Sequence, residues 1–295
     1  MKNRHFFLVA LFWVAYLFSF QTKAQSRILE SLAFKSDILK SEVKYSVYLP
    51  ADYAVSKRDY PVLFLLHGYT GDNTDWTQKG DIQHIADEMI KNGELTPCVI
   101  IMPDAGNCYY LDSYDGKWDY HKMLVKEFVP AMRSEYRLRD GSRYTAVAGL
   151  SMGGFGATLF AAKNPDVFGQ AVALSAAFWT DERLIGLDQK GFQRSFGPQL
   201  GNDLKGKKRV SGLWKEFSPL ILFKTADKDK MNTVRWYFDC GDDDFLYIGN
   251  DRMHTLLRNR GIRHEYRMRD GAHNWAYWRS GIRLGLAFLN EGFTN

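Results

Sequence analysis

The sequence predicts an α/β domain with a mostly parallel central sheet flanked by helices. Residues 61–68 and 97–104 are continuously apolar and end in turn residues, as strands buried on both faces do. Between them, residues 81–93 have helical spacing and end at a glycine. Such alternation of buried strands with amphipathic helices is typical of a parallel sheet covered on both faces.

The other elements continue this alternation along the chain. Residues 43–50 alternate in polarity, which predicts a half-buried edge strand before the first buried one. The next expected elements are an amphipathic helix at 118–136, a buried strand at 144–149, a helix at 153–162 and a strand at 170–175. The C-terminal part predicts a strand at 233–241, a helix at 246–261, a last strand at 263–271 and a last helix at 275–290.

Residues 178–231 interrupt the alternation. This stretch is rich in Lys, Gly and Asp and carries only isolated apolar residues. It predicts a cap or lid insertion that shapes specificity. Because no repeat, low-complexity tract or Pro/Gly/Ser linker divides the chain, residues 25–295 are expected to form a single domain.

The first 24 residues are expected to be a secretory signal peptide. An uncharged apolar run at 6–20 follows Lys2 and Arg4, and a small residue, Ala24, precedes the expected cleavage site. The run has 15 residues, fewer than the roughly 20 that a membrane-spanning helix needs. We therefore expect a periplasmic or secreted protein with no membrane attachment after cleavage.

Charge and cysteine content exclude several classes of protein. Without the three basic residues of the signal segment, the net charge falls from +5 to +2, too little to predict a nucleic-acid partner. Cys98, Cys108 and Cys240 are too few and too scattered for a disulfide framework or a zinc site. Whether Cys108 and Cys240 pair stays open, as does the oligomeric state, and no metal or organic cofactor is expected.

A serine stands between two glycines where a predicted strand meets a predicted helix. The segment GLSMG (149–153) fits the pattern G-x-S-x-G, in which a sharp turn exposes a nucleophilic serine. Glycines tolerate the unusual backbone angles near such a turn and avoid clashes across it. Free N–H groups at the helix start would face an oxyanion formed at Ser151. The sequence therefore predicts Ser151 as a nucleophile, with a simple packing turn as the alternative.

A serine hydroxyl needs a base and a third group that orients the base. With this motif the usual chain order is serine, acid, histidine. Of the histidines after Ser151, His254 lies in a predicted helix and His264 in a predicted strand. His273 lies in the loop after the last strand, at the sheet edge where ligand-facing groups collect. His273 is thus the predicted base; His67, which precedes the serine, is the alternative.

The acid is expected at the end of the strand at 233–241. Four carboxylates are available there, Asp239, Asp242, Asp243 and Asp244, and spacing alone does not select one. A second backbone donor for the oxyanion is expected from the loop at 65–72, where a glycine lets the chain approach a ligand closely. The predicted donor is the N–H of Tyr69.

Four segments together carry a family resemblance: LHGYTGD (66–72), GLSMGGFGA (149–157), DCGDDDFLY (239–247) and GAHNWAYW (271–278). In this order and spacing they resemble the putative esterase family of α/β-hydrolases. That family includes feruloyl and acetylxylan esterases, S-formylglutathione hydrolase and mycolyltransferases of the antigen 85 type. The resemblance covers most of residues 40–292 and implies an α/β-hydrolase fold.

The resemblance also implies roles for single residues. In the family's CG-x-x-D-F pattern the acid is the third residue after the glycine, which is Asp244 here, with Asp243 as the second choice. The family's histidine coincides with the base inferred above, and its backbone donors fall on Tyr69 and Met152. The implied reaction is a two-step acyl transfer in which the serine attacks an ester, an alcohol leaves and water frees the acid.

The loop GYTGD lacks the cysteine of formylglutathione hydrolases and is similar to the carbohydrate-esterase branch. We therefore expect an exported serine carboxylesterase acting on small-molecule or oligosaccharide esters, with feruloyl or acetyl groups linked to plant polysaccharides. The alternatives are an acyltransferase of the mycolyltransferase type, a thioesterase resembling S-formylglutathione hydrolase, and a non-catalytic binding protein. The aromatic side chains expected to contact substrate are Tyr109, Tyr110, Phe178, Trp179, Trp275 and Trp278.

Overall fold

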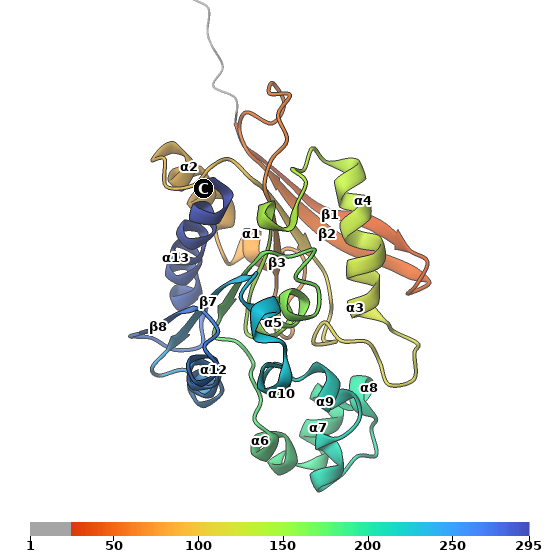
Figure 1. Ribbon diagram of the computed structural model, residues 1–295. Coiled ribbons are helices and arrows are strands. Elements are labelled where there is room, and N and C mark those ends of the chain that lie inside the picture. Colours follow the sequence, from red (N-terminus) through yellow and green to blue (C-terminus); the bar gives the residue numbers. More distant parts are fainter. Residues whose placement is uncertain (1–24, 295) are drawn as a thin grey trace, which may run out of the picture.

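An eight-stranded sheet forms the centre of the computed structural model, which describes residues 25–294 (Figure 1). The strands are β1 (Arg27–Ser36), β2 (Ser41–Leu49), β3 (Val62–Leu66), β4 (Val99–Pro103), β5 (Thr145–Leu150), β6 (Gln170–Leu174), β7 (Arg235–Gly241) and β8 (Glu265–Arg269). Their spatial order is β1-β2-β4-β3-β5-β6-β7-β8. The two pairs that contain β2 are antiparallel and all other pairs are parallel. The predicted mostly parallel α/β architecture is confirmed.

The first strand, β1, has no counterpart among the predicted elements. It pairs antiparallel with β2 from Arg27 opposite Leu49 to Ser36 opposite Ser41, so β2 lies inside the sheet. The prediction of residues 43–50 as an edge strand is therefore wrong. The reason is that β1 is itself the edge and is mostly exposed or half-buried. Its sequence consequently lacks the apolar run that marks a buried strand.

Helices cover both faces of the sheet. The main ones are α1 (Asp75–Gln78), α2 (Ile82–Lys91), α3 (Tyr120–Met123), α4 (Val129–Glu135), α5 (Met152–Lys163), α12 (Tyr247–Arg260) and α13 (Trp275–Thr294). α2 and α13 lie side by side on one face and share a hydrophobic cluster with the sheet (Figure 1). α3, α4, α5 and α12 contribute to the cluster on the opposite face. Because both faces are covered, β3 and β4 are buried along their whole length.

The helix predicted at 118–136 contains a π-helical turn, η1 (Leu124–Phe128), between α3 and α4. Pro130 lies in the first turn of α4. Proline has no N–H, and its ring clashes with the carbonyl four residues earlier in a regular helix. The wider π turn immediately before it is the usual local adjustment to such a clash. The amphipathic pattern therefore predicts the position of the helix along the chain but not the π-helical turn within it.

One buried histidine gives the fold a pH dependence. His121 in α3 stacks on Phe160 of α5 with ring centroids 4.6 Å apart, and Asn164 lies 3.2 Å from its Nε2 atom. Burial, followed by the charge of Lys163, lowers the pKa of His121 to about 3. In the unfolded chain the same group titrates near pH 6.5.

Acid is therefore expected to destabilise the protein through His121. Below about pH 6.5 the imidazole of His121 binds a proton in the unfolded chain but not in the native state. Each further pH unit below this value therefore lowers the free energy of unfolding by about 1.4 kcal/mol. His121→Phe retains a ring against Phe160 and does not titrate. Urea unfolding at pH 7 and pH 5 should show about 2 kcal/mol less acid-induced loss in this variant. Equal losses in both proteins would contradict the assignment.

The segment predicted as a cap, residues 178–231, folds into short helices. These are α6 (Asp181–Gly186), α7 (Gln189–Ser195), α8 (Gly197–Leu200), η3 (Gly206–Val210), α9 (Leu213–Phe217), α10 (Pro219–Thr225) and α11 (Lys228–Met231). The 3₁₀ turn η2 (Ser142–Tyr144) lies outside this segment, immediately before β5. α6 to α9 form one end of the molecule (Figure 1), and we call residues 178–217 the cap. α10 packs against α5 and α12 and so belongs to the helical layer of the sheet. The predicted insertion is thus too long at its C-terminal end.

A buried arginine organises the cap. The guanidinium of Arg209 donates hydrogen bonds to the carbonyl oxygens of Leu184, Ile185 and Leu187. These carbonyls lie at the end of α6, where helical C=O groups lack partners within the helix. One charged side chain therefore joins η3 to α6, beside the buried apolar residues of the cap such as Phe192 and Trp214.

All three cysteines are buried and free, so Cys108 and Cys240 do not form a disulfide. Burial raises the pKa of the Cys98 and Cys108 thiols to about 12. Within residues 25–294, no helix combines the length and the apolar character needed to cross a bilayer. The predicted signal peptide, residues 1–24, lies outside the described residues.

Candidate active site

Ser151 lies in a tight turn between β5 and α5. Its backbone angles are φ 53° and ψ −116°, a conformation that L-residues rarely adopt. A Cβ atom on Gly149 would lie 2.4 Å from the carbonyl carbon of Gly153, and one on Gly153 would lie 2.4 Å from the carbonyl oxygen of Leu66. Both glycines of the motif are thus required by close backbone approach, and the strained turn holds the serine at the end of the sheet.

Three side chains from separate loops form a hydrogen-bonded chain at this point. His273 Nε2 lies 3.0 Å from Ser151 Oγ, and His273 Nδ1 lies 2.8 Å from Asp244 Oδ2. The carboxylate only accepts, so the proton on the imidazole is on Nδ1 and Nε2 faces the serine hydroxyl as an acceptor. The three residues follow β5, β7 and β8, whose carboxyl ends meet at the same edge of the sheet.

Asp244 is ionised in a buried position. The residue is 1% exposed, and its Oδ1 accepts a hydrogen bond of 2.8 Å from the N–H of Leu246. Burial raises the pKa of this carboxyl, but hydrogen bonds and charge from His273, with smaller contributions from Leu246 and Ser175, outweigh it and bring the pKa below its ordinary value. The group that faces the imidazole therefore carries a negative charge at neutral pH.

The other three aspartates of this region do not contact His273. Asp239 is buried within β7, where the guanidinium of Arg269 binds both of its carboxylate oxygens. Asp242 accepts from the backbone N–H groups of Asp243 and Gly271 and thereby shapes the turn. Spacing alone did not select one aspartate because the choice depends on the shape of the turn after β7. That turn directs the side chain of Asp244 into the protein and those of Asp242 and Asp243 toward solvent.

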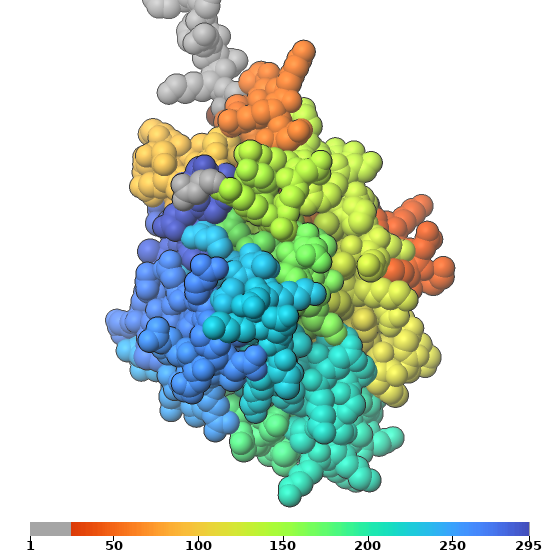
Figure 2. All heavy atoms as spheres, viewed as in Figure 1, coloured from red at the N-terminus to blue at the C-terminus, as the bar shows by residue number. Residues whose placement is uncertain are grey.

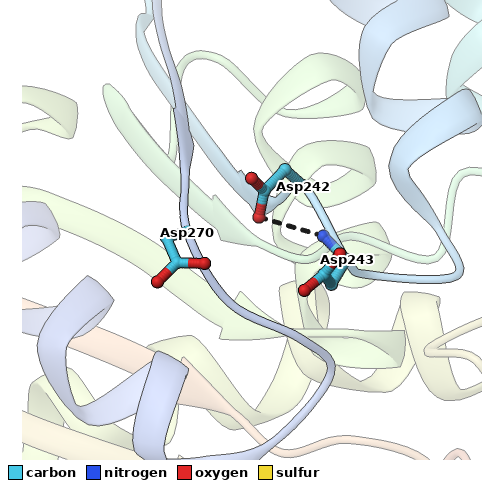
Figure 3. A group of neighbouring side chains, drawn as sticks. All are labelled: Asp242, Asp243 and Asp270. Carbon is cyan, nitrogen blue, oxygen red and sulfur yellow. Dashed lines mark hydrogen bonds between the residues drawn. The ribbon is translucent and has the colours of Figure 1, made fainter.

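Asp242, Asp243 and Asp270 form an exposed acidic group next to this turn (Figure 3). One ligand atom from each lies within 4.8 Å of the others. A cation could be held there, but all three carboxylates are exposed and exposed acidic groups are common without an ion. The group lies outside the hydrogen-bonded chain of Ser151, and the chemistry described below does not involve it.

His67 has both ring nitrogens engaged by the backbone. Its Nδ1 lies 2.8 Å from the carbonyl oxygen of Gly68, and its Nε2 accepts from the N–H of Ala105 at 2.9 Å. Its side chain is buried and does not contact Ser151. The alternative that His67 is the base is therefore excluded by its surroundings; its contact with Gly68 instead fixes the orientation of the next peptide group.

Two backbone N–H groups are available to an oxyanion. Met152 opens α5, so its N–H has no acceptor within the helix. The carbonyl of Gly68 is held by His67, and because a trans peptide directs C=O and N–H to opposite sides, the N–H of Tyr69 points away from His67. Among the described residues neither N–H has a hydrogen-bond acceptor. The sequence predicted these two N–H groups as oxyanion donors, a role that stays a prediction.

The other two late histidines form a pair away from the serine. His254 Nδ1 lies 2.8 Å from His264 Nε2, and His264 Nδ1 donates to the carbonyl oxygen of Ile262. His254 also stacks on Tyr266, with ring centroids 4.5 Å apart. Both histidines therefore serve the packing of α12 against the end of the sheet.

A cavity of about 640 Å³ opens in front of Ser151. The predicted aromatic residues Tyr109, Trp179 and Trp275 line it, together with His273. Tyr109 packs against Phe196 of the cap with ring centroids 4.5 Å apart. The cavity therefore has an aromatic wall, and part of this wall belongs to the cap.

Tyr110 and Phe178 do not line the cavity, contrary to expectation. They are 0% and 1% exposed. The hydroxyl of Tyr110 donates to the carbonyl oxygen of His67, and a Cβ on Gly156 would collide with its ring. Phe178 packs on Phe238. Each is a neighbour in sequence of a residue that does face the cavity, and successive residues of a loop point in different directions.

Phe245, Arg194 and Ser175 also belong to the site and were not singled out from the sequence. Phe245 packs against His273 with tilted rings whose centroids lie 4.5 Å apart, and it is largely exposed in the cavity. Arg194 of the cap lines the same cavity. Trp278 donates from Nε1 to the hydroxyl of Ser175, the serine that also lowers the pKa of Asp244. Phe245 follows the acid directly, which is a usable signal; nothing in the sequence marks Arg194 or Ser175.

Comparisons with known proteins show which proteins this chain resembles over most of its length. A family model described as putative esterase matches residues 36–289. An acetyl esterase of Caldicellulosiruptor saccharolyticus is 27% identical over 273 residues, covering 88% of this chain and 96% of that protein. The solved structure of a ferulic acid esterase superposes with a TM-score of 0.78 at 32% identity, covering 91% of this chain and 99% of the other.

A further solved structure is the fluorophosphonate-binding serine hydrolase F of Staphylococcus aureus. It has a TM-score of 0.76 and 25% identity, covering 90% of this chain and 98% of the other. The structural relatives are esterases of the α/β-hydrolase fold, so the fold that the sequence motifs implied is confirmed.

Proposed function

Since this chain belongs to the putative esterase family and is a carboxylic ester hydrolase, we propose that it is an exported serine esterase that releases aromatic, feruloyl-type acyl groups from plant polysaccharides. The observation that carries the serine mechanism is the hydrogen-bonded chain from Ser151 through His273 to Asp244. Export rests on the charged start and apolar run of the first 20 residues.

In the first step Ser151 Oγ attacks the ester carbonyl carbon, and His273 Nε2 takes the hydroxyl proton. Asp244 holds the imidazole by Nδ1 and stabilises the positive charge that it gains. The carbonyl oxygen becomes an oxyanion that accepts from the N–H groups of Tyr69 and Met152. Collapse of this intermediate breaks the bond to the alcohol oxygen, which leaves with the proton from His273, and an acyl-serine remains.

In the second step a water molecule gives a proton to His273 and attacks the acyl carbon. The same two N–H groups stabilise the new oxyanion. When it collapses, the bond to Ser151 Oγ breaks, the serine regains its proton from His273, and the carboxylic acid is released. Over the two steps the protons balance, since one ester and one water molecule give one alcohol and one carboxylic acid.

The preference for an aromatic acyl group is supported by the shape and lining of the cavity. A volume of about 640 Å³ is in the range of pockets that hold ligands of drug size, 300–1,000 Å³, and is far larger than an acetyl group requires. Tyr109, Trp179 and Trp275 offer ring faces and edges against which a phenolic ring can stack. The 32% identity to a ferulic acid esterase supports the same substrate class.

Methyl ferulate is expected to be hydrolysed with a kcat/KM at least about 10-fold above that of p-nitrophenyl acetate, once the acetate value is corrected for the better leaving group, p-nitrophenolate. The reason is that about 1.4 kcal/mol from stacking of the ferulate ring corresponds to a factor of ten. The measurement is a panel of methyl ferulate, acetylated xylan, p-nitrophenyl acetate and a formyl thioester, scored by kcat/KM. Trp179→Ala should remove the advantage of ferulate and leave acetate hydrolysis within a few-fold. Preferred turnover of acetylated xylan or of the thioester would overturn the proposed acyl group.

A further inference from the structure

A second carboxylate lies buried near the one that faces His273. Asp239 is 0% exposed and belongs to β7, five residues before Asp244. Strand positions that are covered on both faces are normally apolar, as they are in β3 and β4. A buried charge is costly unless it is paired, so the partners of Asp239 indicate its role.

Two partners of Asp239 lie at the two ends of the loop that carries His273. Arg269, the last residue of β8, donates from Nε to Oδ2 at 2.9 Å and from Nη2 to Oδ1 at 3.0 Å. Tyr277, in the first turn of α13, donates its hydroxyl proton to Oδ1. Because one carboxylate binds both side chains, it closes the loop of residues 270–276 at its base.

The loop between these two anchors is short, and His273 is its midpoint, four residues from either anchor. The guanidinium of Arg269 lies over the ring of Tyr277, with Cζ 4.1 Å from the ring centroid, so the anchors also contact each other. A Cβ on Gly271 would lie 2.5 Å from Cδ2 of Tyr277, which shows that the ring packs closely against the backbone of the loop. The loop therefore has little freedom to shift the imidazole.

β7 and the turn that follows it contact the loop at three places. Asp239 binds its ends, Asp244 lies 2.8 Å from Nδ1 of His273, and the N–H of Asp243 donates to the carbonyl oxygen of Gly271 at 3.1 Å. β7, β8 and α13 all belong to the C-terminal part of the chain, whose blue atoms gather on one side of the molecule in Figure 2. The loop is thus held both at its base and at its histidine.

Proton transfer from the serine depends on the distance between His273 Nε2 and Ser151 Oγ, which is 3.0 Å. A displacement of about 1 Å at a reacting group can lower a rate about 100-fold. We propose that Asp239 is a positioning residue: by clamping the two ends of the loop, it keeps His273 within hydrogen-bond distance of Ser151. The inference rests on the proposed function, because it takes these two residues as base and nucleophile.

The test removes the clamp in three ways. Asp239→Asn and Arg269→Gln break the ion pair from either side, and Tyr277→Phe removes one hydroxyl but retains the ring. Arg267→Gln is the matched control, since Arg267 lies two residues earlier on the same strand, is exposed and pairs with Glu265 at 2.7 Å.

The measurement is steady-state hydrolysis of p-nitrophenyl acetate, with kcat expressed per site after Ser151 has been titrated to completion with a fluorophosphonate. The two variants that break the ion pair are expected to lose about 100-fold in kcat per site. Tyr277→Phe should lose about 5-fold, the size of one net hydrogen bond. KM should stay within twofold in all of them, and Arg267→Gln should match the wild type within twofold in both constants.

A purely structural role of Asp239 gives a different result. It would lower the midpoint of thermal unfolding and the number of titratable sites but leave kcat per site unchanged, and that outcome would overturn the proposal. If breaking the ion pair leaves no titratable sites, Tyr277→Phe, which retains the pair, decides between the two results.

The rate at which the fluorophosphonate labels Ser151 separates this inference from the proposed substrate, since labelling needs the same base but no ester. A wild type that is labelled but hydrolyses no feruloyl ester would refute the proposed acyl group only. Equal labelling rates in the wild type and in Tyr277→Phe would refute the role of Asp239 only.

Discussion

Ser151→Ala is expected to lower kcat for ester hydrolysis by about 10⁴–10⁶-fold, because the nucleophile of a serine triad cannot be replaced by the remaining groups. The residual rate would come from the two backbone donors and from substrate binding. KM should change little, since Ser151 forms its new bond only after the substrate is bound. The measurement is steady-state hydrolysis of methyl ferulate or p-nitrophenyl acetate by purified wild type and variant.

The control for this variant is its stability. Alanine has the same backbone preferences as serine at φ 53° to a first approximation, so the midpoint of thermal unfolding should stay close to that of the wild type. Labelling by a fluorophosphonate probe should be stoichiometric in the wild type and absent in the variant. A folded variant with undiminished activity would show that a different residue is acylated.

Asp244→Asn is expected to lower kcat by about 10⁴-fold with no gross change in structure. An asparagine can present its NH₂ group to His273 Nδ1 and thereby favour the tautomer with the proton on Nε2. That tautomer cannot accept the proton of Ser151. The negative charge that stabilises the imidazolium in the transition state is lost as well.

The neighbouring residue offers a matched control for this experiment. Asp243→Asn changes an adjacent, exposed carboxylate on the same turn after β7 (Figure 3). The carboxylate that contacts His273 is that of Asp244. Its activity should stay within about threefold of the wild type, the size expected for losing an exposed charge. If the two variants exchanged these results, Asp243 and not Asp244 would orient the base in solution.

The buried strands and the places of Ser151 and His273 at strand ends followed from local patterns in the sequence. Strands such as β3 and β4 carry uninterrupted apolar runs because helices cover both faces. Ser151 was found because its motif reports a backbone conflict that only glycines relieve, and His273 because ligand-facing groups collect at strand ends. Such features can be predicted because the burial or close backbone approach that causes them acts on the same few residues that carry the sequence pattern.

Other features depend on contacts that no local pattern records. β1 is a strand only because β2 offers it a partner, and its exposed face carries no apolar run. Tyr109 faces the cavity while Tyr110 lies in the core. Both have φ above 50°, an unusual backbone conformation that the sequence of this loop does not indicate. Residue spacing likewise does not identify Asp244 as the aspartate that contacts His273, because the shape of the turn after β7 determines which carboxylate points inward.

The contact between Ser151 and His273 joins residues 122 positions apart in the chain. Closing that distance requires β5, β6, β7 and β8 to be paired in register, whereas helices and single strand pairs can form with far less of the chain in place. Hydrolysis of an ester is therefore a stricter criterion of the native state than circular dichroism. A chain recovered from inclusion bodies can regain its secondary structure and still lack this contact, and under the proposed mechanism it would then not hydrolyse the ester.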